Sequence, residues 1–383
     1  MWGVTVMKLS LRGALAALLC LCLFGSVLCL PAAAEPSVSA ACAVVMDADS
    51  GRIVWAKNAD TRHAMASTTK IMTALVALRT AELDRTLEVS PEAAGIEGSS
   101  VYLYPGEKLT LEELLYAMLL ESANDAAAAI AIALSGSVEA FAAEMNACAA
   151  ELGLVDTHFT NPHGLWDEAH YTTAAELARI TRAAMAYPAF RTMVATYRKT
   201  IPLNQTEGVR LLINHNKLLK LSDAVIGVKT GYTKKSGRCL VSAAERGGVT
   251  LIAVTLDAPD DWQDHLLMLD YGFSRLTHYS FGAAGELRYT LPVAGGEPDY
   301  VTLFNTAPLA VTLPADAPPP ELRVELPRIL YAPVTANAQL GQICCVSDGE
   351  VVASSPLVAT FAVDRVPVKM GFWTRLGRLL GIC

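Results

Sequence analysis

Ser67 and Lys70 are the first residues in the chain whose types and spacing could carry out covalent chemistry. The segment around them, residues 63–78, is otherwise apolar and predicts a helix. Side chains three residues apart share one helix face, so the lysine amine could reach the serine hydroxyl. A lysine kept neutral by burial beside a second cation can act as a general base, and a serine at a helix N-terminus can offer its N–H to an oxyanion. Taken alone, this short pattern favours an N-cap serine beside a solvated lysine.

Two further segments supply the other groups that acyl transfer needs. Ser122 and Asn124 interrupt an apolar helical stretch, which indicates a loop that enters a cleft. Lys229 and Thr230 lie in a predicted strand and are followed by Gly231, which would let a substrate backbone approach closely. A serine near a lysine, a second hydroxyl and a strand-borne cation for an anionic group together make a complete acyl-transfer site.

The elements that must position these groups can be read from the periodicity of the chain. A hairpin is predicted where two alternating segments flank the turn at residues 47–51. Helical periodicity occurs at residues 67–80, 111–134, 138–152 and 172–186, and strand character occurs at 225–233, 238–244 and 249–256. Strands at both ends with helices between them predict an α+β fold, in which helices pack on an antiparallel sheet.

The composition changes again after this region. From about residue 281, short valine- and leucine-rich runs are separated by proline and glycine, including Ala-Pro-Pro-Pro at 317–320. This pattern predicts a second, small all-β domain at the C-terminal side. The predicted organisation is a signal peptide at 1–34, an acyl-transfer domain at 35–278, a β-rich domain at 279–366 and a terminal helix at 367–383.

The N-terminal segment is typical of secretion. Lys8 and Arg12 precede an apolar run at 13–30 that ends in Pro-Ala-Ala-Ala, which predicts a signal peptide cleaved after Ala34. An uncleaved membrane anchor is the alternative, although the run is near the lower length limit for a span. Cleavage would remove two cations and no acid, so the formal charge of the mature chain is 28 − 38 = −10. This charge disfavours nucleic acid as a partner.

The cysteines and histidines give no sign of a metal site. Six cysteines remain after residue 34, too few for a scaffold held by disulfides, and we interpret them as buried free thiols. The seven histidines are scattered, and neither Cys-x-x-Cys nor His-Glu-x-x-His occurs. The sequence therefore predicts no metal and no cofactor.

Three motifs occur in a fixed order: Ser-Thr-Thr-Lys at 67–70, Ser-Ala-Asn at 122–124 and Lys-Thr-Gly at 229–231. With them, residues 37 to about 275 resemble the low-molecular-mass penicillin-binding proteins that are serine-type D-alanyl-D-alanine carboxypeptidases. The supporting segments are Asn-Pro-His-Gly-Leu at 161–165, His-Tyr-Thr-Thr-Ala at 170–174, Asn-His-Asn at 214–216 and Gly-Arg-Cys-Leu-Val at 237–241. The resemblance implies a β-lactamase/transpeptidase-like fold.

The resemblance also implies roles for individual residues. Ser67 would form the acyl-enzyme after activation by Lys70. Ser122 and Asn124 would relay protons and hold the peptide. The backbone N–H groups of Ser67 and Tyr232 would form the oxyanion hole.

The Lys-Thr-Gly strand would recognise the substrate. Lys229 and Thr230 would bind its terminal carboxylate beside Gly231, and Arg238 either adds charge there or is a surface residue. Structural hydrogen bonding is the expected role of the three histidines in the supporting segments, His163, His170 and His215, because a lysine already serves as the base.

The implied partners lie outside the cytoplasmic membrane. The substrate would be the peptide stem of peptidoglycan, and β-lactam antibiotics would be covalent inhibitors. The tail at 368–383 carries three cations, Lys369, Arg375 and Arg378, and no acid, and at helical spacing its apolar residues share one side. It is too short and too charged for a span but suits an interfacial helix on a membrane surface. A last helix packed on the β-rich domain is the alternative.

Two other functions share some of these sequence features. A class A β-lactamase shares the acylation groups but needs a glutamate positioned for deacylation, and no Glu-x-x-Leu-Asn occurs between Asn124 and Lys229. A sensor or scaffold that binds β-lactams or peptides without turnover is the other, yet none of the three motifs is degraded. Turnover of a peptide ending in D-Ala-D-Ala, compared with turnover of a β-lactam, would separate the three.

Overall fold

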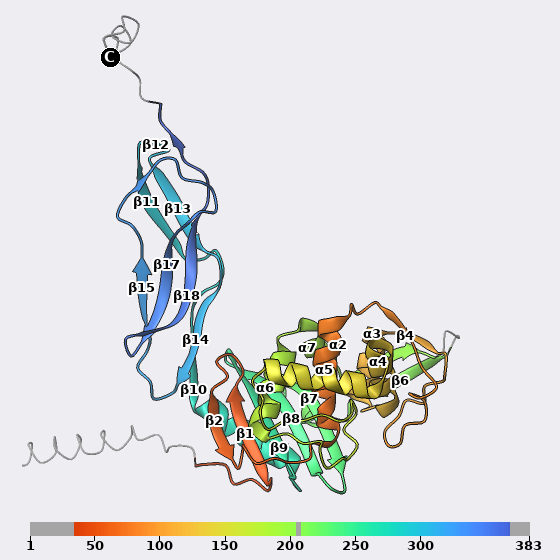
Figure 1. Cartoon of the computed structure of the whole chain (residues 1–383). Coiled ribbons are helices and arrows are strands. Elements are labelled where there is room, and N and C mark those ends of the chain that lie inside the picture. The colour runs from red at the N-terminus through yellow and green to blue at the C-terminus, as the bar shows by residue number, and fades with distance from the viewer. Residues whose placement is uncertain (1–33, 204–207, 368–383) are drawn as a thin grey trace, which may run out of the picture.

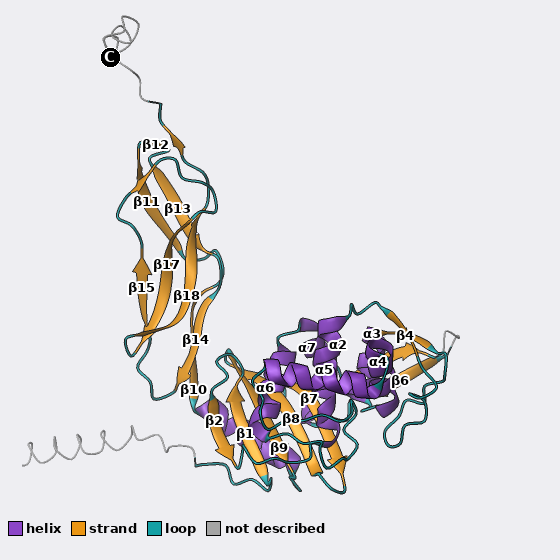
Figure 2. Cartoon of the chain, in the orientation of Figure 1, coloured by secondary structure: helices purple, strands orange, loops and turns teal. Residues whose placement is uncertain are grey.

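The computed structural model describes residues 34–203 and 208–367 of the chain. A body of helices packed on a sheet is followed by an elongated body made only of strands (Figure 1). Figure 2 shows that the helices are confined to the first of these bodies. The predicted signal peptide before Ala34 and the predicted terminal helix after Pro367 lie outside the described residues.

The first body is built around a five-stranded sheet with the order β2-β1-β9-β8-β7, in which every pairing is antiparallel. Its strands are β1 (Cys42–Asp47), β2 (Ile53–Lys57), β7 (Val225–Thr233), β8 (Gly237–Arg246) and β9 (Val249–Leu256). The predicted bounds 225–233 and 249–256 match β7 and β9. The antiparallel sheet with packed helices confirms the predicted α+β class.

Helices cover both faces of this sheet. Along β1, Val44 and Met46 pack into one apolar core, while Ala43 and Val45 pack into another on the opposite face. Successive residues of a strand point to opposite faces, so a strand buried on both sides is continuously apolar. The first face carries α2 (Lys70–Thr80), α3 (Leu111–Leu120), α4 (Asn124–Ser135), α5 (Val138–Glu151), α6 (Ala174–Met185) and α7 (Pro188–Ala195), and the second carries α8 (Leu218–Leu221) and α9 (Asp261–Ser274).

The helical stretch predicted at residues 111–134 is two helices. Thr110 and Glu113 form a capping box at the start of α3, since each side chain satisfies a backbone N–H of the other residue. Ser122, with a φ of 60°, lies between α3 and α4. The polar interruption, from which a loop was predicted, therefore marks the break between the two helices.

Two helical predictions need correction. The helix predicted from residue 67 begins instead with the 3₁₀ turn η1 (Ala66–Thr69), and α2 starts at Lys70. The sequence analysis also missed α9, whose segment contains several aspartates and Gly272, residue types with low helix propensity. Packing of Met268 and Leu269 against the sheet stabilises α9 and overrides this low propensity.

Two small hairpins flank the helices near the site. One consists of β3 (Thr86–Glu88) and β4 (Lys108–Thr110), and the other of β5 (Arg198–Pro202) and β6 (Val209–Ile213). No single helix among the described residues is long and apolar enough to cross a membrane, and only α4 and α5 taken together, bent by 85° at their junction, meet the length and composition of a span.

The second body confirms the predicted all-β domain. It contains a six-stranded sheet with the order β15-β17-β18-β13-β11-β16 around a core that includes Leu303, Ile343 and Leu357. Its strands are β10 (Leu276–Gly282), β11 (Arg288–Ala294), β12 (Gly296–Glu297), β13 (Tyr300–Asn305), β14 (Leu309–Pro314), β15 (Glu321–Glu325), β16 (Leu330–Tyr331), β17 (Gln339–Ser347), β18 (Glu350–Ala359) and β19 (Asp364–Arg365). The strand β10 runs through the junction predicted at 278–279 and pairs with β14.

Candidate active site

Ser67 and Lys70 meet at the junction of η1 and α2. The Lys70 Nζ lies 2.9 Å from the Ser67 Oγ. A 3₁₀ turn has three residues per turn, so side chains three positions apart are eclipsed rather than offset as in an α-helix. The 3₁₀ turn that the sequence analysis did not foresee therefore places the two groups directly above one another.

The Lys70 amine is fully buried and has two further partners. Its Nζ lies 2.7 Å from the Asn124 Oδ1 and 2.7 Å from the His163 backbone oxygen. Both of these oxygens can only accept hydrogen bonds, whereas the Ser67 hydroxyl can accept or donate. A neutral amine would donate its two hydrogens to these oxygens, and its lone pair would then face the hydroxyl hydrogen of Ser67. This arrangement orients the amine as a base.

Burial and a neighbouring cation favour that neutral form. Burial is the main cause that lowers the pKa of Lys70 well below its usual value, and the charge of Lys229 lowers it further, while the Asp125 carboxylate opposes both. Burial also lowers the pKa of Lys229, to about 7. The requirement for a second cation, stated from the sequence, is met by Lys229.

The Asn124 side chain is held from the opposite side by the loop before β4. Its Nδ2 donates to the Glu97 backbone oxygen at 2.6 Å, and its backbone N–H donates to the Ser99 oxygen at 2.7 Å. Gly98 has a φ of 90°, and a Cβ there would lie 2.9 Å from the Asn124 Nδ2. The glycine thus lets this loop pass close enough to fix the amide.

Asp125 is a structural contributor that the sequence analysis missed. Its side chain is fully buried and accepts hydrogen bonds from the Ser100 hydroxyl at 2.6 Å and from the Leu103 N–H at 3.0 Å. It therefore anchors the loop that contacts Asn124. The available signal was its place in the first turn of α4, where a carboxylate is favoured by the helix dipole.

The β7 strand passes directly beside the η1 turn that carries Ser67. A Cβ on Gly231 would lie 3.0 Å from the Ser67 backbone nitrogen and 3.2 Å from the Met65 oxygen. From the sequence, Gly231 was expected to make room for a substrate backbone. In the structure, the close neighbour is the chain's own η1 turn, so this glycine sets how near β7 can come to Ser67.

These elements enclose a cavity of about 360 Å³. Five of the predicted site residues line it, namely Ser67, Ser122, Thr230, Gly231 and Tyr232. The other lining residues are Ser99, His215, Lys217, Arg238, Asp261 and Trp262. Three other predicted site residues, Lys70, Asn124 and Lys229, are buried and do not line it. The Lys229 Nζ donates instead to the Thr230 backbone oxygen at 2.9 Å.

Arg238, whose role the sequence left open, belongs to this cavity. Its Nη2 donates to the Asp261 Oδ1 at 2.8 Å, and its guanidinium carbon lies 5.6 Å from the centre of the Trp262 ring. Its Nε is buried without a hydrogen-bond partner among the described residues. A guanidinium placed in this way can form an ion pair with an anionic ligand and donate hydrogen bonds to it.

The three histidines of the supporting segments differ in their placement. His163 contributes its backbone oxygen to Lys70, and burial lowers the pKa of its ring to about 3. His170 is buried beside η1, and burial lowers its pKa to about 4. His215 lines the cavity, with its Nε2 3.1 Å from the Glu121 Oε2. Two of the three rings are therefore neutral at pH 7.

The described cysteines agree with the expectation of buried thiols. Cys42, Cys148, Cys239, Cys344 and Cys345 are all buried and free. The sixth, at position 383, lies outside the described residues. Burial raises the pKa of Cys239 to about 12, so its thiol stays protonated.

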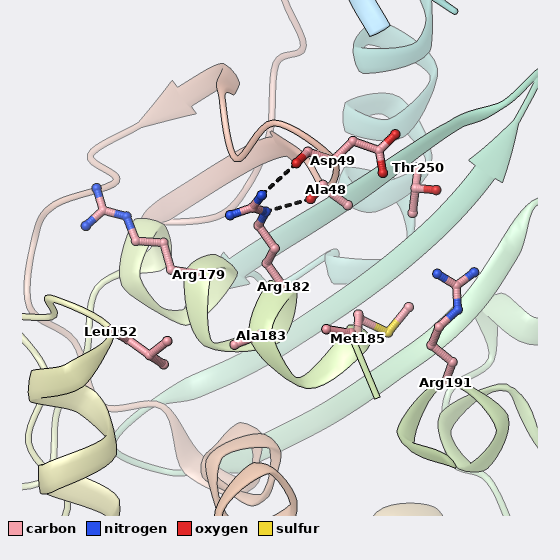
Figure 3. A pocket seen from close by; sticks show the side chains of 10 residues that line it. Ala48, Asp49, Leu152, Arg179, Arg182, Ala183, Met185, Arg191 and Thr250 are labelled. Carbon is pink, nitrogen blue, oxygen red and sulfur yellow. Dashed lines mark hydrogen bonds between the residues drawn. The ribbon is translucent and has the colours of Figure 1, made fainter. Parts of the chain in front are cut away.

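Another cavity, of about 570 Å³, opens beside α6 (Figure 3). Arg182 points into it and donates to the backbone oxygens of Ala48 and Asp49, both at 2.6 Å, which ties α6 to the β1–β2 turn. Arg191 forms an ion pair with Glu245. None of the described residues that line this cavity is a serine, lysine, cysteine or histidine. Arg182 and Arg191 are engaged in these contacts within the chain, and the groups suited to acyl transfer lie in the smaller cavity.

Comparison with known protein families covers both bodies of the chain. The family described as D-alanyl-D-alanine carboxypeptidase matches residues 31–260, and the family described as the penicillin-binding protein 5 C-terminal domain matches residues 277–365.

Curated relatives and solved structures point the same way. The chain is 32% identical to D-alanyl-D-alanine carboxypeptidase DacF of Bacillus subtilis (strain 168), over 88% of each chain. It is 36% identical to a D-alanyl-D-alanine carboxypeptidase of Streptomyces sp. (strain K15), over 63% of this chain and 90% of the relative. It resembles penicillin-binding protein 5 from Haemophilus influenzae, with a TM-score of 0.63 and 28% identity over 87% of this chain and 99% of that one. It also resembles the Streptomyces K15 DD-transpeptidase, with a TM-score of 0.60 and 34% identity over 63% of this chain and 99% of that one. The chain belongs to the D-alanyl-D-alanine carboxypeptidase family.

Proposed function

We propose that this protein is a serine-type D-alanyl-D-alanine carboxypeptidase that removes the terminal D-alanine from peptidoglycan stem peptides. The observation that carries the proposal is the position of the buried Lys70 amine, 2.9 Å from the Ser67 hydroxyl and fixed by two obligate acceptors. Penicillin would acylate the same serine, because its strained amide presents an equivalent carbonyl group.

The reaction begins with an acylation step. The Ser67 Oγ attacks the carbonyl carbon of the penultimate D-alanine while its proton passes to the Lys70 Nζ. The N–H groups of Ser67 and Tyr232 stabilise the oxyanion of the tetrahedral intermediate. The C–N bond then breaks, and the leaving amine takes the proton from Lys70 through the Ser122 hydroxyl. Deacylation repeats these proton transfers with water as the nucleophile, which releases the shortened peptide and restores Ser67.

Recognition of the substrate's terminal carboxylate is assigned to the β7 edge and its neighbours. Thr230 and Arg238 line the cavity, and the buried Lys229 and Asn124, which do not line it, would act on the bound peptide as the resemblance implies. Thr230 and Arg238 can therefore contact the carboxylate directly, whereas the Lys229 ammonium would contribute its charge from a buried position outside the cavity lining. Gly231 and Tyr232 supply the strand edge along which an extended peptide can pair.

A β-lactamase activity is less well supported. Rapid hydrolysis of the acyl-enzyme needs a carboxylate that activates water. Among the described residues that line the cavity, Asp261 is the only carboxylate, and it is paired with Arg238 at 2.8 Å. The proposed enzyme therefore forms a persistent penicilloyl-enzyme rather than turning penicillin over.

The proposed location follows from the two terminal segments, which lie outside the described residues except for Ala34 and Pro367. Residues 1–34 would direct secretion and be removed, and residues 367–383 would lie on the outer face of the cytoplasmic membrane as an amphipathic helix. Deleting residues 368–383 should release the mature protein from membranes while cleavage of a small soluble peptide stays unchanged. A truncated protein that stayed in the membrane fraction after confirmed signal cleavage would rule out the tail as the anchor.

The central experiment measures peptide cleavage and penicillin acylation on the same protein. Wild-type protein should release D-alanine from a D-Ala-D-Ala stem peptide and gain the mass of one penicillin on the peptide that contains Ser67. The Ser67→Ala variant should lose both, and the control Ser274→Ala, at an exposed position at the end of α9, should lose neither. Penicillin labelling of Ser67→Ala at another residue would refute the assignment. Labelling of wild type without release of D-alanine would favour a sensor.

A further inference from the structure

The buried ring of His170 has a defined tautomer. Its Nδ1 lies 3.1 Å from the backbone nitrogen of Thr160, which can only donate. Since a neutral imidazole has one acceptor nitrogen and one donor nitrogen, Nδ1 is the acceptor and Nε2 carries the hydrogen. The Nε2 lies 2.8 Å from the Thr69 Oγ1. His170 therefore donates a hydrogen bond to the Thr69 hydroxyl.

The Thr69 hydroxyl links His170 to the η1 turn that carries Ser67. Its Oγ1 donates to the Ala66 backbone oxygen at 2.7 Å. That oxygen and the Ser67 nitrogen belong to the same planar peptide group, so fixing the carbonyl direction also fixes the direction of the Ser67 N–H. Hydrogen bonds in a chain polarise one another, so a bond accepted by the carbonyl strengthens the N–H as a donor.

The conformation of this peptide needs such support. Ala66 has a φ of 46°, in the left-handed region that non-glycine residues seldom adopt. Two glycines hold the peptide from either side: a Cβ on Gly164 would lie 1.9 Å from the Ala66 oxygen, and a Cβ on Gly231 would lie 3.0 Å from the Ser67 nitrogen. The peptide is thus confined by packing and oriented by one side-chain hydrogen bond.

We propose that His170 and Thr69 are positioning residues that orient and polarise the Ser67 N–H as an oxyanion donor. Neither touches the substrate, and both act through the Ala66 carbonyl. This inference rests on the proposed function, because it requires the Ser67 N–H to be part of the oxyanion hole. The inference gives different roles to the two hydroxyls near Ser67. Ser122 lines the cavity, whereas Thr69 is buried and acts through its hydrogen bond to the Ala66 carbonyl.

The test compares two substitutions of Thr69. Thr69→Val keeps the branched shape but removes the hydroxyl, so the acylation rate constant with a fluorescent penicillin should fall about 10- to 100-fold, less than the loss of a whole oxyanion donor. The dissociation constant of the initial complex should stay within about twofold, because ground-state contacts are unaltered. Thr69→Ser keeps the hydroxyl and should retain most of the rate. The matched control is Thr181→Val, which removes another fully buried hydroxyl that donates to a backbone oxygen, in α6.

A vibrational readout separates positioning from a general loss of structure. In isotope-edited infrared difference spectra of the acyl-enzyme, the ester carbonyl band of Thr69→Val should move to higher frequency, because the oxyanion hole donates a weaker hydrogen bond. The band should be unchanged in Thr181→Val and Thr69→Ser. At the ring, His170→Gln can still donate from a nitrogen near the Nε2 position and should retain more activity than His170→Asn.

The outcomes distinguish this inference from the proposed function. If wild type is acylated on Ser67 and Thr69→Val acylates at the same rate with the same carbonyl band, the relay is wrong and the proposed function stands. A change confined to the initial dissociation constant would also overturn the relay. If wild type is not acylated on Ser67, the proposed function itself fails.

Discussion

Replacing Arg210 with methionine should destabilise the first body and slow acylation, although this residue does not touch the nucleophile. Arg210, on β6, pairs with Glu107 through both carboxylate oxygens, and its Nε and Nη2 donate to the backbone oxygens of Val101 and Tyr102 at 2.9 and 3.1 Å. The side chains of Arg210 and Glu107 are 9% and 0% exposed. The pair therefore ties a hairpin to the loop that carries Ser99.

The magnitude follows from burial. Removing Arg210 takes the cation away from the buried Glu107 carboxylate, which keeps the Tyr104 N–H as a donor at 3.1 Å, and breaking a buried ion pair in this way costs about 3–5 kcal/mol. A surface pair is worth less than about 1 kcal/mol, and the Arg191–Glu245 pair, 43% and 42% exposed, is the matched control. For a body of this size we expect Arg210→Met to lower the melting temperature by roughly 6–20 °C. Arg191→Met should lower it by only a few degrees.

The effect on acylation follows from the loop's contacts. The Ser99 backbone oxygen accepts the Asn124 N–H, and the Leu103 N–H donates to Asp125, so a displaced loop would release the amide that holds Lys70. Acylation by penicillin should therefore slow in Arg210→Met at a temperature where the variant is folded.

The assay is denaturant and thermal unfolding of the variants, with penicillin acylation followed in parallel. The double variant Arg210→Met with Glu107→Gln should recover part of the lost stability, because it also removes the buried charge. Equal losses of stability in Arg210→Met and Arg191→Met would refute the reasoning from burial. A double variant no more stable than Arg210→Met would refute the role assigned to the Glu107 charge.

Three further predictions test charge states in the molecule. Lys70→Arg should slow penicillin acylation about 10²- to 10⁴-fold, since a guanidinium stays protonated, and wild-type labelling rates in this variant would exclude a general base at this position. If the Lys229 ammonium binds the substrate carboxylate, the KM for a free-acid peptide should rise as the pH passes about 7, the pKa of this lysine, whereas a KM that is flat to pH 9 would assign the carboxylate to Arg238. Burial lowers the pKa of His265 to about 3, so below pH 6.5 the unfolded chain binds a proton that the folded chain does not, and stability falls by about 3 kcal/mol between pH 7 and pH 4. The free energy of unfolding of the His265→Gln variant should lack this loss of about 3 kcal/mol between pH 7 and pH 4. An identical pH dependence of stability in wild type and variant would contradict the role assigned to His265.

Local sequence patterns were sufficient for the order of the three motifs, the α+β class and several element bounds. These features are local: runs with strand character at 225–233 and 249–256 predicted β7 and β9, and two polar residues in an apolar stretch predicted a loop where α3 ends and α4 begins. The pairing of Ser67 with Lys70 was also accessible, because three residues of separation bring side chains together in any right-handed helical turn.

The surroundings of these residues depend on contacts between distant segments, which no local pattern predicts. The third partner of Lys70 is the backbone oxygen of His163, 93 positions away, and no local pattern marks a backbone oxygen as an acceptor. Likewise, Lys229 and Arg238 were both candidates for the substrate carboxylate, yet Arg238 lines the cavity and Lys229 is buried and does not line it. Burial, pKa and hydrogen-bond partners depend on which distant segments pack together, and that packing is a property of the whole fold rather than of any single segment.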